Sequence, residues 1–262
     1  MNTETVLVLR VANAEGRSWG GFQWPERGPV EAPDWSPKKV CGQGLHAWLK
    51  GEGNTRVTDI RYDSIWQVVE VLAADVVDLD GKVKFPRGWV IYSGTRDEAV
   101  RIVQARHPEA ACVFGTATAG YCGTAIAGYG GTATAGDYGT AVVGDYGTAT
   151  AGHSGTATAD DYGTATAGDY GTATAGGGGT ATAGKNGTAT AGDCGTAAAG
   201  HCGTATVGEG GTASAGNYGT VVVHCYDHGG EGRRRLLVGY VGENGILPNV
   251  AYGAKNGRLV PA

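Results

Sequence analysis

The middle of the chain alternates threonine with alanine, and glycines interrupt the alternation at a fixed distance. A Gly-Thr dipeptide recurs every eight residues from 115 to 219, which gives fourteen octads with the consensus Gly-Thr-Ala-Thr-Ala-Gly-x-x. A period of two predicts a strand, while paired glycines and β-branched threonines disfavour a helix. A flexible linker needs only the composition, whereas here the spacing is strict. We therefore expect a β-solenoid over residues 115–226.

Eight residues are too few to close a coil with two strands and two turns, so each coil takes two octads. The repeats then form about seven coils of sixteen residues. Only alanine is small enough to fill the gap between two closely opposed sheets, so we expect Ala to point inward and Thr outward. The glycines at the first and sixth octad positions are expected at the turns, where they supply a positive φ or permit close backbone approach.

The segment before the repeats, residues 1–114, has the pattern of an α+β domain. Apolar positions predict strands at Val6–Ala12, Ile65–Leu72, Val76–Leu79, Val83–Phe85 and Trp89–Tyr92. Asp80-Gly81 is typical of a hairpin turn.

One helix is predicted at the end of this domain. Thr95-Arg96-Asp97-Glu98 has the form of a capping box, in which the Thr and Glu side chains bond to backbone amides. An apolar face follows, and Pro108 comes after the expected helix end. That face consists of Ala99, Val100, Ile102 and Val103.

The segment after the repeats, residues 227–262, is expected to be a short β cap. The last octad becomes bulky at Val221–Val223, and strands are predicted at Arg233–Tyr240 and Leu247–Tyr252. An open solenoid end exposes unpaired backbone, so we expect the N-terminal domain to cover the first coil and the C-terminal segment to cover the last. The predicted fold is mainly β.

Composition and charge separate the repeats from their flanks. All 6 Trp and all 3 Phe lie in residues 1–114, and the net charge of −5 is concentrated in the repeats. Without a basic stripe, no nucleic-acid partner is expected. The early apolar run is too short for a signal peptide or a membrane span, which favours a cytoplasmic protein. The 6 Cys are expected as free thiols.

Two octads per coil sort the seventh and eighth positions into two edges. The even octads place a column of carboxylates at the seventh position: Asp145, Asp161, Asp193 and Glu209. Tyr146 and Tyr162 follow in the same edge and are expected to stack. Stacked carboxylates repel, so a cationic partner would stabilise this edge, and an exposed tyrosine ladder is typical of a dimer seam. A solvated edge is the alternative.

The edge formed by the odd octads is mixed in charge. Its seventh positions hold Asp137, His153, Asp169, Lys185 and His201. This edge carries no single-sign surface for a partner.

Candidate chemistry is sparse elsewhere. Two groups hold residue types that bind metals: Cys41 with His46, and His224 with Cys225, Asp227 and His228. Neither has the spacing of a structural zinc site, so we predict no metal and no cofactor. The alternative without a function is that His46 is a structural histidine in a turn beside Trp48. Since none of the nucleophile, phosphate or metalloprotease motifs is present, the sequence favours a protein that is not an enzyme.

The repeats, as in Tyr138-Gly139-Thr140 and the Thr-x-Thr strand Thr148-Ala149-Thr150, resemble the sixteen-residue coils of bacterial ice-nucleation proteins. The resemblance implies an alternative function, the binding of ice or ordered water. In the odd octads five consecutive Thr-x-Thr rows are complete, whereas Ile126 and Val142 interrupt the other face. The rows are Thr116/Thr118, Thr132/Thr134, Thr148/Thr150, Thr164/Thr166 and Thr180/Thr182.

The whole architecture also resembles phage and prophage proteins of unknown function. The shared parts are Gly44-Leu45-His46-Ala47, the octads, and a closing segment from Gly242 to Tyr252. That family has Cys after His-Ala, where this chain has Trp48. The resemblance implies a mobile-element protein and no activity. Our main functional prediction is therefore a non-enzymatic scaffold that presents the acidic, aromatic edge to a protein partner or to a second copy in a homodimer.

A third possibility comes from residues 42–47. Gly42-Gln43-Gly44-Leu45-His46-Ala47 is similar to the strand that lines the nicotinamide pocket of ADP-ribosyltransferases, although His46 stands where Tyr is usual. Tyr62 and Glu70 follow where such enzymes keep an aromatic and an acidic residue. The resemblance implies either an active or a degenerate domain of this type.

Overall fold

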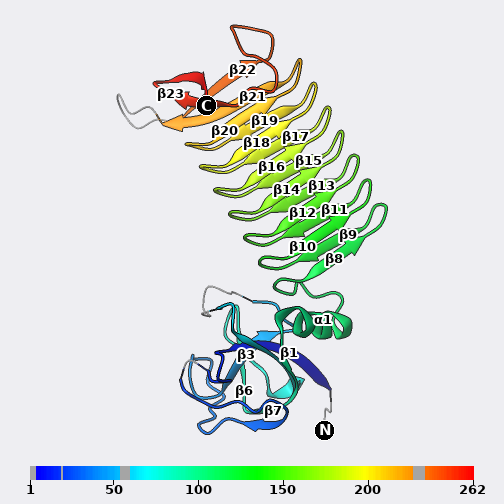
Figure 1. The fold of residues 1–262 in the computed structure, drawn as a ribbon, viewed down its shortest axis with the longest axis vertical. Helices are drawn as coiled ribbons and strands as arrows, with labels where there is room; N and C mark the ends of the chain where they lie inside the picture. The colour runs from blue at the N-terminus through cyan, green and yellow to red at the C-terminus, as the bar shows by residue number, and fades with distance from the viewer. Residues whose placement is uncertain (1–3, 19, 54–59, 227–233) are drawn as a thin grey trace. The chain divides into compact units, whose positions relative to one another are not determined.

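The computed structural model describes residues 4–18, 20–53, 60–226 and 234–262, and it is mainly β (Figure 1). The chain divides into two compact units, Met1–Gly115 and Thr116–Ala262. The first is a small α+β unit, and the second contains a β-solenoid of about seven turns. The predicted fold class is confirmed.

The N-terminal unit is built on one antiparallel sheet with the strand order β2-β7-β4-β1-β3-β6-β5. A short 3-10 helix, Ala73–Asp75, follows β4. The elements are β1 Thr5–Ala12, β2 Gly28–Glu31, β3 Leu45–Leu49, β4 Ile65–Leu72, β5 Val77–Asp78, β6 Val83–Phe85, β7 Arg87–Gly94 and α1 Arg96–Arg106.

Large apolar side chains fill the core of this unit, where Val8, Val69, Phe85 and Val90 have no exposed surface. The predicted strands are present, with β5 shorter and β7 longer than expected. Two strands were missed. β2 contains Gly and Pro, which are rare in strands, and it lies at the sheet edge, where Pro is tolerated. β3 contains His46, so the expectation of a turn histidine is wrong.

Helix α1 begins where the sequence predicts, but the capping box does not form. Thr95 is the N-cap residue and its side chain makes no capping hydrogen bond. Its hydroxyl instead lies 3.3 Å from the Tyr92 hydroxyl, which also accepts a hydrogen bond from the Thr95 amide at 2.9 Å. Glu98 pairs with Arg101 at 2.6 Å. The side chain of Thr95 therefore contacts Tyr92 of β7, and the side chain of Glu98 contacts Arg101 of the helix, so neither caps the helix.

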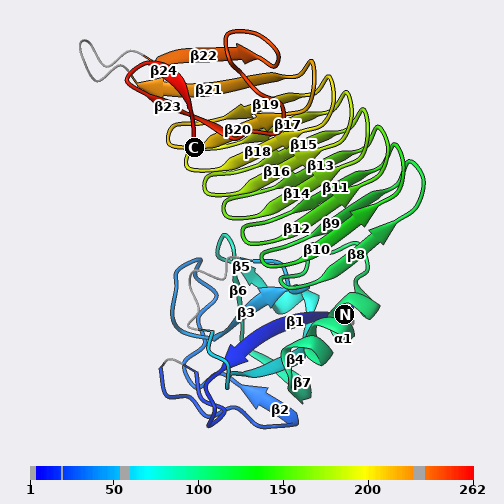
Figure 2. The same ribbon diagram turned by 45° about the horizontal axis from the view of Figure 1, so that its top comes forward.

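In the second unit, each octad forms one strand, and the coils stack in a single direction (Figure 2). The odd octads form a nine-stranded sheet together with β23 and β24, and the even octads form an eight-stranded sheet together with β22. The odd-octad strands are β8 Thr116–Ala119, β10 Thr132–Ala135, β12 Thr148–Ala151, β14 Thr164–Ala167, β16 Thr180–Ala183, β18 Thr196–Ala199 and β20 Thr212–Ala215. The even-octad strands are β9 Thr124–Ala127, β11 Thr140–Val143, β13 Thr156–Ala159, β15 Thr172–Ala175, β17 Thr188–Ala191, β19 Thr204–Val207 and β21 Thr220–Tyr226.

Alanine faces inward along the rod. Ala149, Ala165 and Ala181 have no exposed surface, while the threonines between them are accessible. Parallel pairing joins each strand to the one sixteen residues away without a register shift, as for Thr148 with Thr164. The prediction of two octads per coil, with Ala inside and Thr outside, is confirmed.

Of the two roles expected for the turn glycines, the structure shows close backbone approach and not positive φ. The left-handed residue is the eighth of each of the first thirteen octads, with φ between 52° and 58° at every non-glycine example from 122 to 218. The first-position glycine permits close approach instead. At Gly139 a Cβ would lie 2.8 Å from the Ala135 Cβ and 2.9 Å from the Gly123 carbonyl oxygen. Positive φ is thus carried largely by Tyr, Cys and Asn, which a search for glycine does not find.

The C-terminal strands extend both sheets of the rod. β22, Arg234–Tyr240, pairs with β21, and β23, Tyr252–Lys255, pairs with β20 and with β24, Arg258–Pro261. The predicted strand Leu247–Tyr252 is wrong, because residues 247–251 lie in no strand and β23 begins only at Tyr252. The Tyr252 hydroxyl accepts the Leu247 amide at 2.8 Å, which fixes this segment and takes it out of the sheet.

Candidate functional site

The outer face of the nine-stranded sheet is an ordered array of threonines. In-register pairing places the second and fourth octad positions of successive coils in two straight columns. Neighbouring strands are about 4.8 Å apart, and alternate residues along a strand are about 6.6 Å apart. Five consecutive rows are complete, from Thr116/Thr118 to Thr180/Thr182, before Ala198 and Ser214 interrupt the fourth-position column. We call these five rows the threonine face.

Threonines of this face reach solvent with little hindrance. Thr132, Thr134, Thr180 and Thr182 are exposed, and Thr166 is half-buried by its neighbours in the same sheet. The eight-stranded sheet has four complete rows, Thr156/Thr158 to Thr204/Thr206, beyond Ile126 and Val142. The longer uninterrupted array is the one that the sequence predicts.

Aromatic rings follow both edges of the rod. On the even-octad edge Tyr146 and Tyr162 stack with ring centroids 5.2 Å apart and planes 12° from parallel. Both are more than half exposed. On the other edge His153 lies between Tyr138 and Tyr170, with centroid distances of 5.8 and 5.4 Å. The predicted stacking of Tyr146 on Tyr162 is therefore present.

The aspartates of the two edges bond to the backbone of the next coil. The Asp161 carboxylate accepts the Gly177 amide at 2.9 Å, and the Asp193 carboxylate accepts the Glu209 amide at 2.8 Å. On the opposite edge Asp169 accepts the Lys185 amide at 2.7 Å. Each of these bonds links seventh positions sixteen residues apart. The carboxylates thus help to hold successive turns together, a role that spacing alone does not reveal.

Like charges nevertheless gather on the even-octad edge. Asp160 replaces the sixth-position glycine of its octad, and its pKa is raised by partial burial and by the nearby carboxylates of Asp145 and Asp161. The edge is acidic as predicted. No described group of three or more His, Cys, Asp or Glu is arranged to hold a metal ion.

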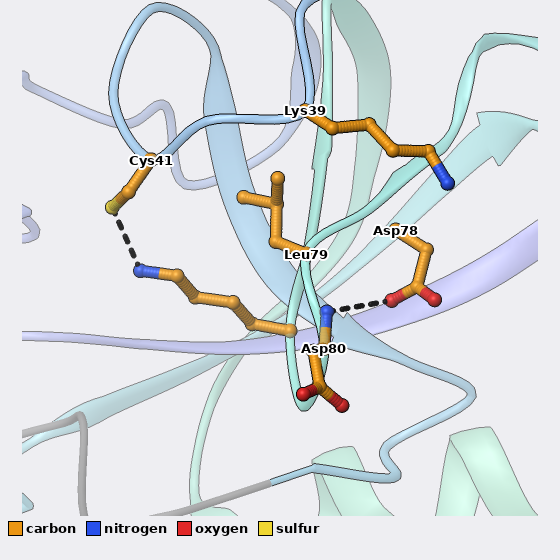
Figure 3. Close-up of a pocket in the computed structure, with 6 residues that line it drawn as sticks. Lys39, Cys41, Asp78, Leu79 and Asp80 are labelled. Atoms are coloured by element: carbon orange, nitrogen blue, oxygen red, sulfur yellow. Dashed lines mark hydrogen bonds between the residues drawn. The ribbon is translucent and has the colours of Figure 1, made fainter.

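The N-terminal unit contains a shallow pocket beside the β5–β6 hairpin (Figure 3). The Lys82 ammonium donates a hydrogen bond to the Cys41 sulfur at 3.1 Å. This bond and the charges of Lys82 and Lys84 lower the pKa of the exposed Cys41 thiol. The pocket is lined by Lys39, Cys41, Asp78, Leu79, Asp80 and Lys82.

A buried cation holds the loop that carries Cys41. Lys84 has no exposed surface, and its ammonium donates to the carbonyl oxygens of Val40 and Gly42 at 3.0 and 3.3 Å. His46 lies opposite Lys84 in the β3–β6 pair, and its buried Nε2 has no hydrogen-bond partner. Burial and the charges of Lys82 and Lys84 lower the pKa of His46. Burial and the two ammonium charges therefore favour the neutral form of the imidazole.

The residues of the nicotinamide-pocket resemblance do not lie in this pocket. Tyr62 is fully exposed. Glu70 lies on β4, where its carboxylate accepts the Thr5 hydroxyl at 2.9 Å and lies 3.7 Å from the Arg106 guanidinium. β1 separates β4 from β3, which carries His46. The structure thus gives Glu70 partners on β1 and α1 and does not assemble it with Tyr62 and His46.

The structure does not bring the described candidate metal ligands together either. Cys41 is bonded to Lys82 rather than to His46. His224 and Cys225 are consecutive residues of β21, so their side chains point to opposite faces of the sheet. Asp227 and His228 lie outside the described residues. Within the described ranges, no helix has the length and apolarity needed to cross a membrane.

Comparison with known proteins divides the chain in the same way. Residues 6–102 match the family model of a domain of unknown function, DUF7666. The chain is also similar to ice nucleation proteins. One from Pseudomonas syringae is 34% identical over 113 residues, which are 42% of this chain and 9% of that protein. No solved structure matches.

Two further ice nucleation proteins show a similar identity and coverage. Ice nucleation protein InaU of Pantoea ananas is 33% identical over 115 residues, covering 43% of this chain and 11% of its own length. An ice nucleation protein of Pseudomonas fluorescens is 36% identical over 102 residues, covering 38% of this chain and 8% of its own length. The chain spans about a tenth of the length of the curated relatives it matches.

Proposed function

We propose that the protein binds ice or ordered water through the threonine face. The observation that carries the proposal is the in-register stacking of five complete Thr-x-Thr rows on one sheet of parallel strands. Each threonine offers one hydroxyl, which both donates and accepts, beside one methyl group. A surface of this kind anchors water without holding a charge.

The spacing of the array suits a tetrahedral water network. Two water molecules that both hydrogen-bond to a third lie about 4.5 Å apart when each hydrogen bond spans about 2.8 Å. The threonine columns repeat at about 4.8 Å along the rod. Hydroxyls of adjacent coils therefore stand at nearly the separation of second neighbours in ordered water. Because the backbone ladder fixes them, little ordering is needed on binding.

The relatives favour this function over the scaffold predicted from the edges. Their similarity to this chain covers about 110 residues, and they are named for ice nucleation. The repeat unit has the length and the threonine pattern to account for that similarity. Only a small part of each relative is matched, so we propose binding of ordered water and not the full activity of those larger proteins.

Thermal hysteresis and droplet freezing of the full-length chain test the proposal. We expect a measurable effect from the wild type and a loss of most of it in Thr148→Lys, which places a long cation in the central row. Lys185→Ala, on the mixed edge, is the matched control because it removes a charge without touching the face. Circular dichroism should show the same β content in all three proteins.

Two results would contradict the proposal. The first is a folded wild type that has no effect in either assay at high concentration. The second is a Thr148→Lys variant with full activity, which would place the active surface elsewhere on the rod.

A second candidate function is recognition of a protein partner by the even-octad edge. The observation that favours it is the exposed, stacked pair Tyr146 and Tyr162 beside the carboxylates of Asp145 and Asp161. Affinity purification from source cells should then retain a protein with a basic surface that Tyr146→Ser fails to retain. Equal retention by both proteins would count against this edge.

A further inference from the structure

The last strand of the eight-stranded sheet presents apolar side chains to solvent. β22 pairs with β21 along all seven of its residues, and no other described strand pairs with its outer side (Figure 2). Leu236, Val238 and Tyr240 are 58%, 48% and 55% exposed. As alternate residues of one strand they share a face. We call these three residues the β22 stripe.

The terminal strand of the other sheet, near the same end of the repeats, is protected by comparison. β24 has only four residues, begins with the exposed Arg258 and ends with Pro261, while Leu259 and Val260 are half-buried. Short length, charge and proline are the usual devices that keep an edge strand from pairing with another chain. β22 has seven residues, no proline, and arginines only at its start. Residues 236–240, which contain the β22 stripe, therefore have neither a charge nor a proline to prevent pairing with another chain.

The sequence of β22 is complementary to itself in antiparallel pairing. A two-fold axis at Leu237 brings Leu236 of one copy opposite Val238 of the other, and the reverse. The same axis places Arg234 opposite Tyr240 of the second copy, which permits a cation–π contact. Arg235 falls opposite Gly239, so no two like charges face each other. All seven residues then have a partner, which no other register of this strand achieves.

Arg234 contacts a tyrosine of the neighbouring strand in its own chain. Its guanidinium donates a hydrogen bond to the Tyr226 hydroxyl at 2.8 Å and lies 5.5 Å from the ring centroid. Tyr226 is on β21, the inner neighbour of β22. The arginine is thus bound at the start of the strand and does not cover the β22 stripe.

We propose that β22 is a dimer interface, in which a second copy of this chain adds its own β22 in antiparallel orientation. The two eight-stranded sheets would become one continuous sheet, with the two stripes side by side. Since a two-fold interface uses the same surface on both copies, it closes at the dimer and does not continue into a filament. The proposal is independent of water binding, because the threonine face lies on the other sheet.

Sedimentation velocity of the full-length chain tests this interface. We expect the wild type to sediment as a dimer at micromolar concentration, and Val238→Lys to sediment as a monomer with at least tenfold weaker association. The matched control is Ile126→Lys on β9. Ile126 is 45% exposed and lies on the strand at the opposite end of the same sheet. The Ile126→Lys variant should therefore remain a dimer.

Amide hydrogen exchange of the wild type gives a second measurement that needs no variant. Exchange in residues 234–240 should slow severalfold as the concentration rises through the dimerisation range, while exchange in 258–261 should not change. A wild type that stays monomeric would overturn the proposal. So would a dimer that survives Val238→Lys or is lost in Ile126→Lys, and so would exchange in β22 that is independent of concentration.

Discussion

The two units of this chain reach stability by opposite means. The N-terminal unit buries large and varied side chains, and Phe85 and Trp24 lie in the same hydrophobic core. The repeat unit buries a column of alanines, and its turns close through backbone hydrogen bonds from each coil to the next. Alanine offers little area, so regular ladders and close glycine contacts must supply most of the stability there. The first unit is stabilised by large buried side chains, whereas the second requires small side chains that let its two sheets approach closely.

This difference explains why the surfaces of the two units differ. A repeat whose interior is almost entirely alanine leaves its outer positions in regular register, and that register makes the threonine face. The N-terminal unit has no such constraint, and its pocket is a local arrangement of Lys82, Lys84 and Cys41. Substitutions that change volume should separate the two units most strongly.

Removal of volume should affect the N-terminal unit most. Phe85→Ala is expected to destabilise it by about 3–5 kcal/mol, because the ring is fully buried and leaves a cavity. All 6 Trp lie in this unit, so tryptophan fluorescence reports its unfolding selectively. The fluorescence midpoint should fall while the far-UV dichroism of the repeats persists. A loss of both signals together would mean that the units unfold as one.

Addition of volume should affect the repeat unit most. Ala165→Leu is expected to destabilise the rod by about 1–3 kcal/mol through overpacking between the two sheets. The far-UV dichroism transition should move to lower temperature, and the fluorescence transition should not. Thr164→Val is the matched control, because Thr164 precedes Ala165 on the same strand and its side chain points to solvent. Greater damage from Thr164→Val would reverse the assignment of the two faces.

The edge aspartates should have smaller effects. Asp169→Ala removes the bond to the Lys185 amide and should destabilise the rod by at most about 1 kcal/mol. Asp161→Ala loses an equivalent bond to Gly177, but it also relieves repulsion with Asp160. Denaturant titration should therefore rank Asp169→Ala as the more damaging of the two. The opposite order would mean that the carboxylates of the even-octad edge do not repel.

The smallest expected change concerns reactivity alone. Lys82 lowers the pKa of the Cys41 thiol, so a larger thiolate fraction is present at a given pH. Burial raises the pKa of Cys112 to about 12, so this thiol should resist alkylation. Mass-spectrometric mapping with iodoacetamide should find Cys41 modified well before Cys112. Lys82→Met should move the rate profile of Cys41 to higher pH, and Lys39→Met should leave it in place.

The sequence is most informative where it repeats. An exact period determined the number of coils, the inward alanines and the threonine rows, because every octad must make the same contacts. It was less informative at the turns, since φ at Tyr170 and the Asp169 bond depend on a neighbouring coil sixteen residues away. Strands β2 and β3 were missed because sheet pairing outweighs their local pattern. The Cys41–Lys82 contact joins residues 41 positions apart, and no local signal predicts it.

Several sequence predictions remain as they were. The cover of the first coil by the N-terminal domain, the cytoplasmic location and the phage or prophage origin stay predictions. So does the absence of a nucleic-acid partner.

Capture of the protein by growing ice tests the central claim most directly. A dilute solution of the wild type is frozen slowly onto a cold surface together with Thr148→Lys carrying a distinguishable label. The account predicts that the wild type becomes enriched in the ice, whereas the variant is left in the remaining liquid. Exclusion of both folded proteins from the ice would contradict the claim that the threonine face binds ordered water.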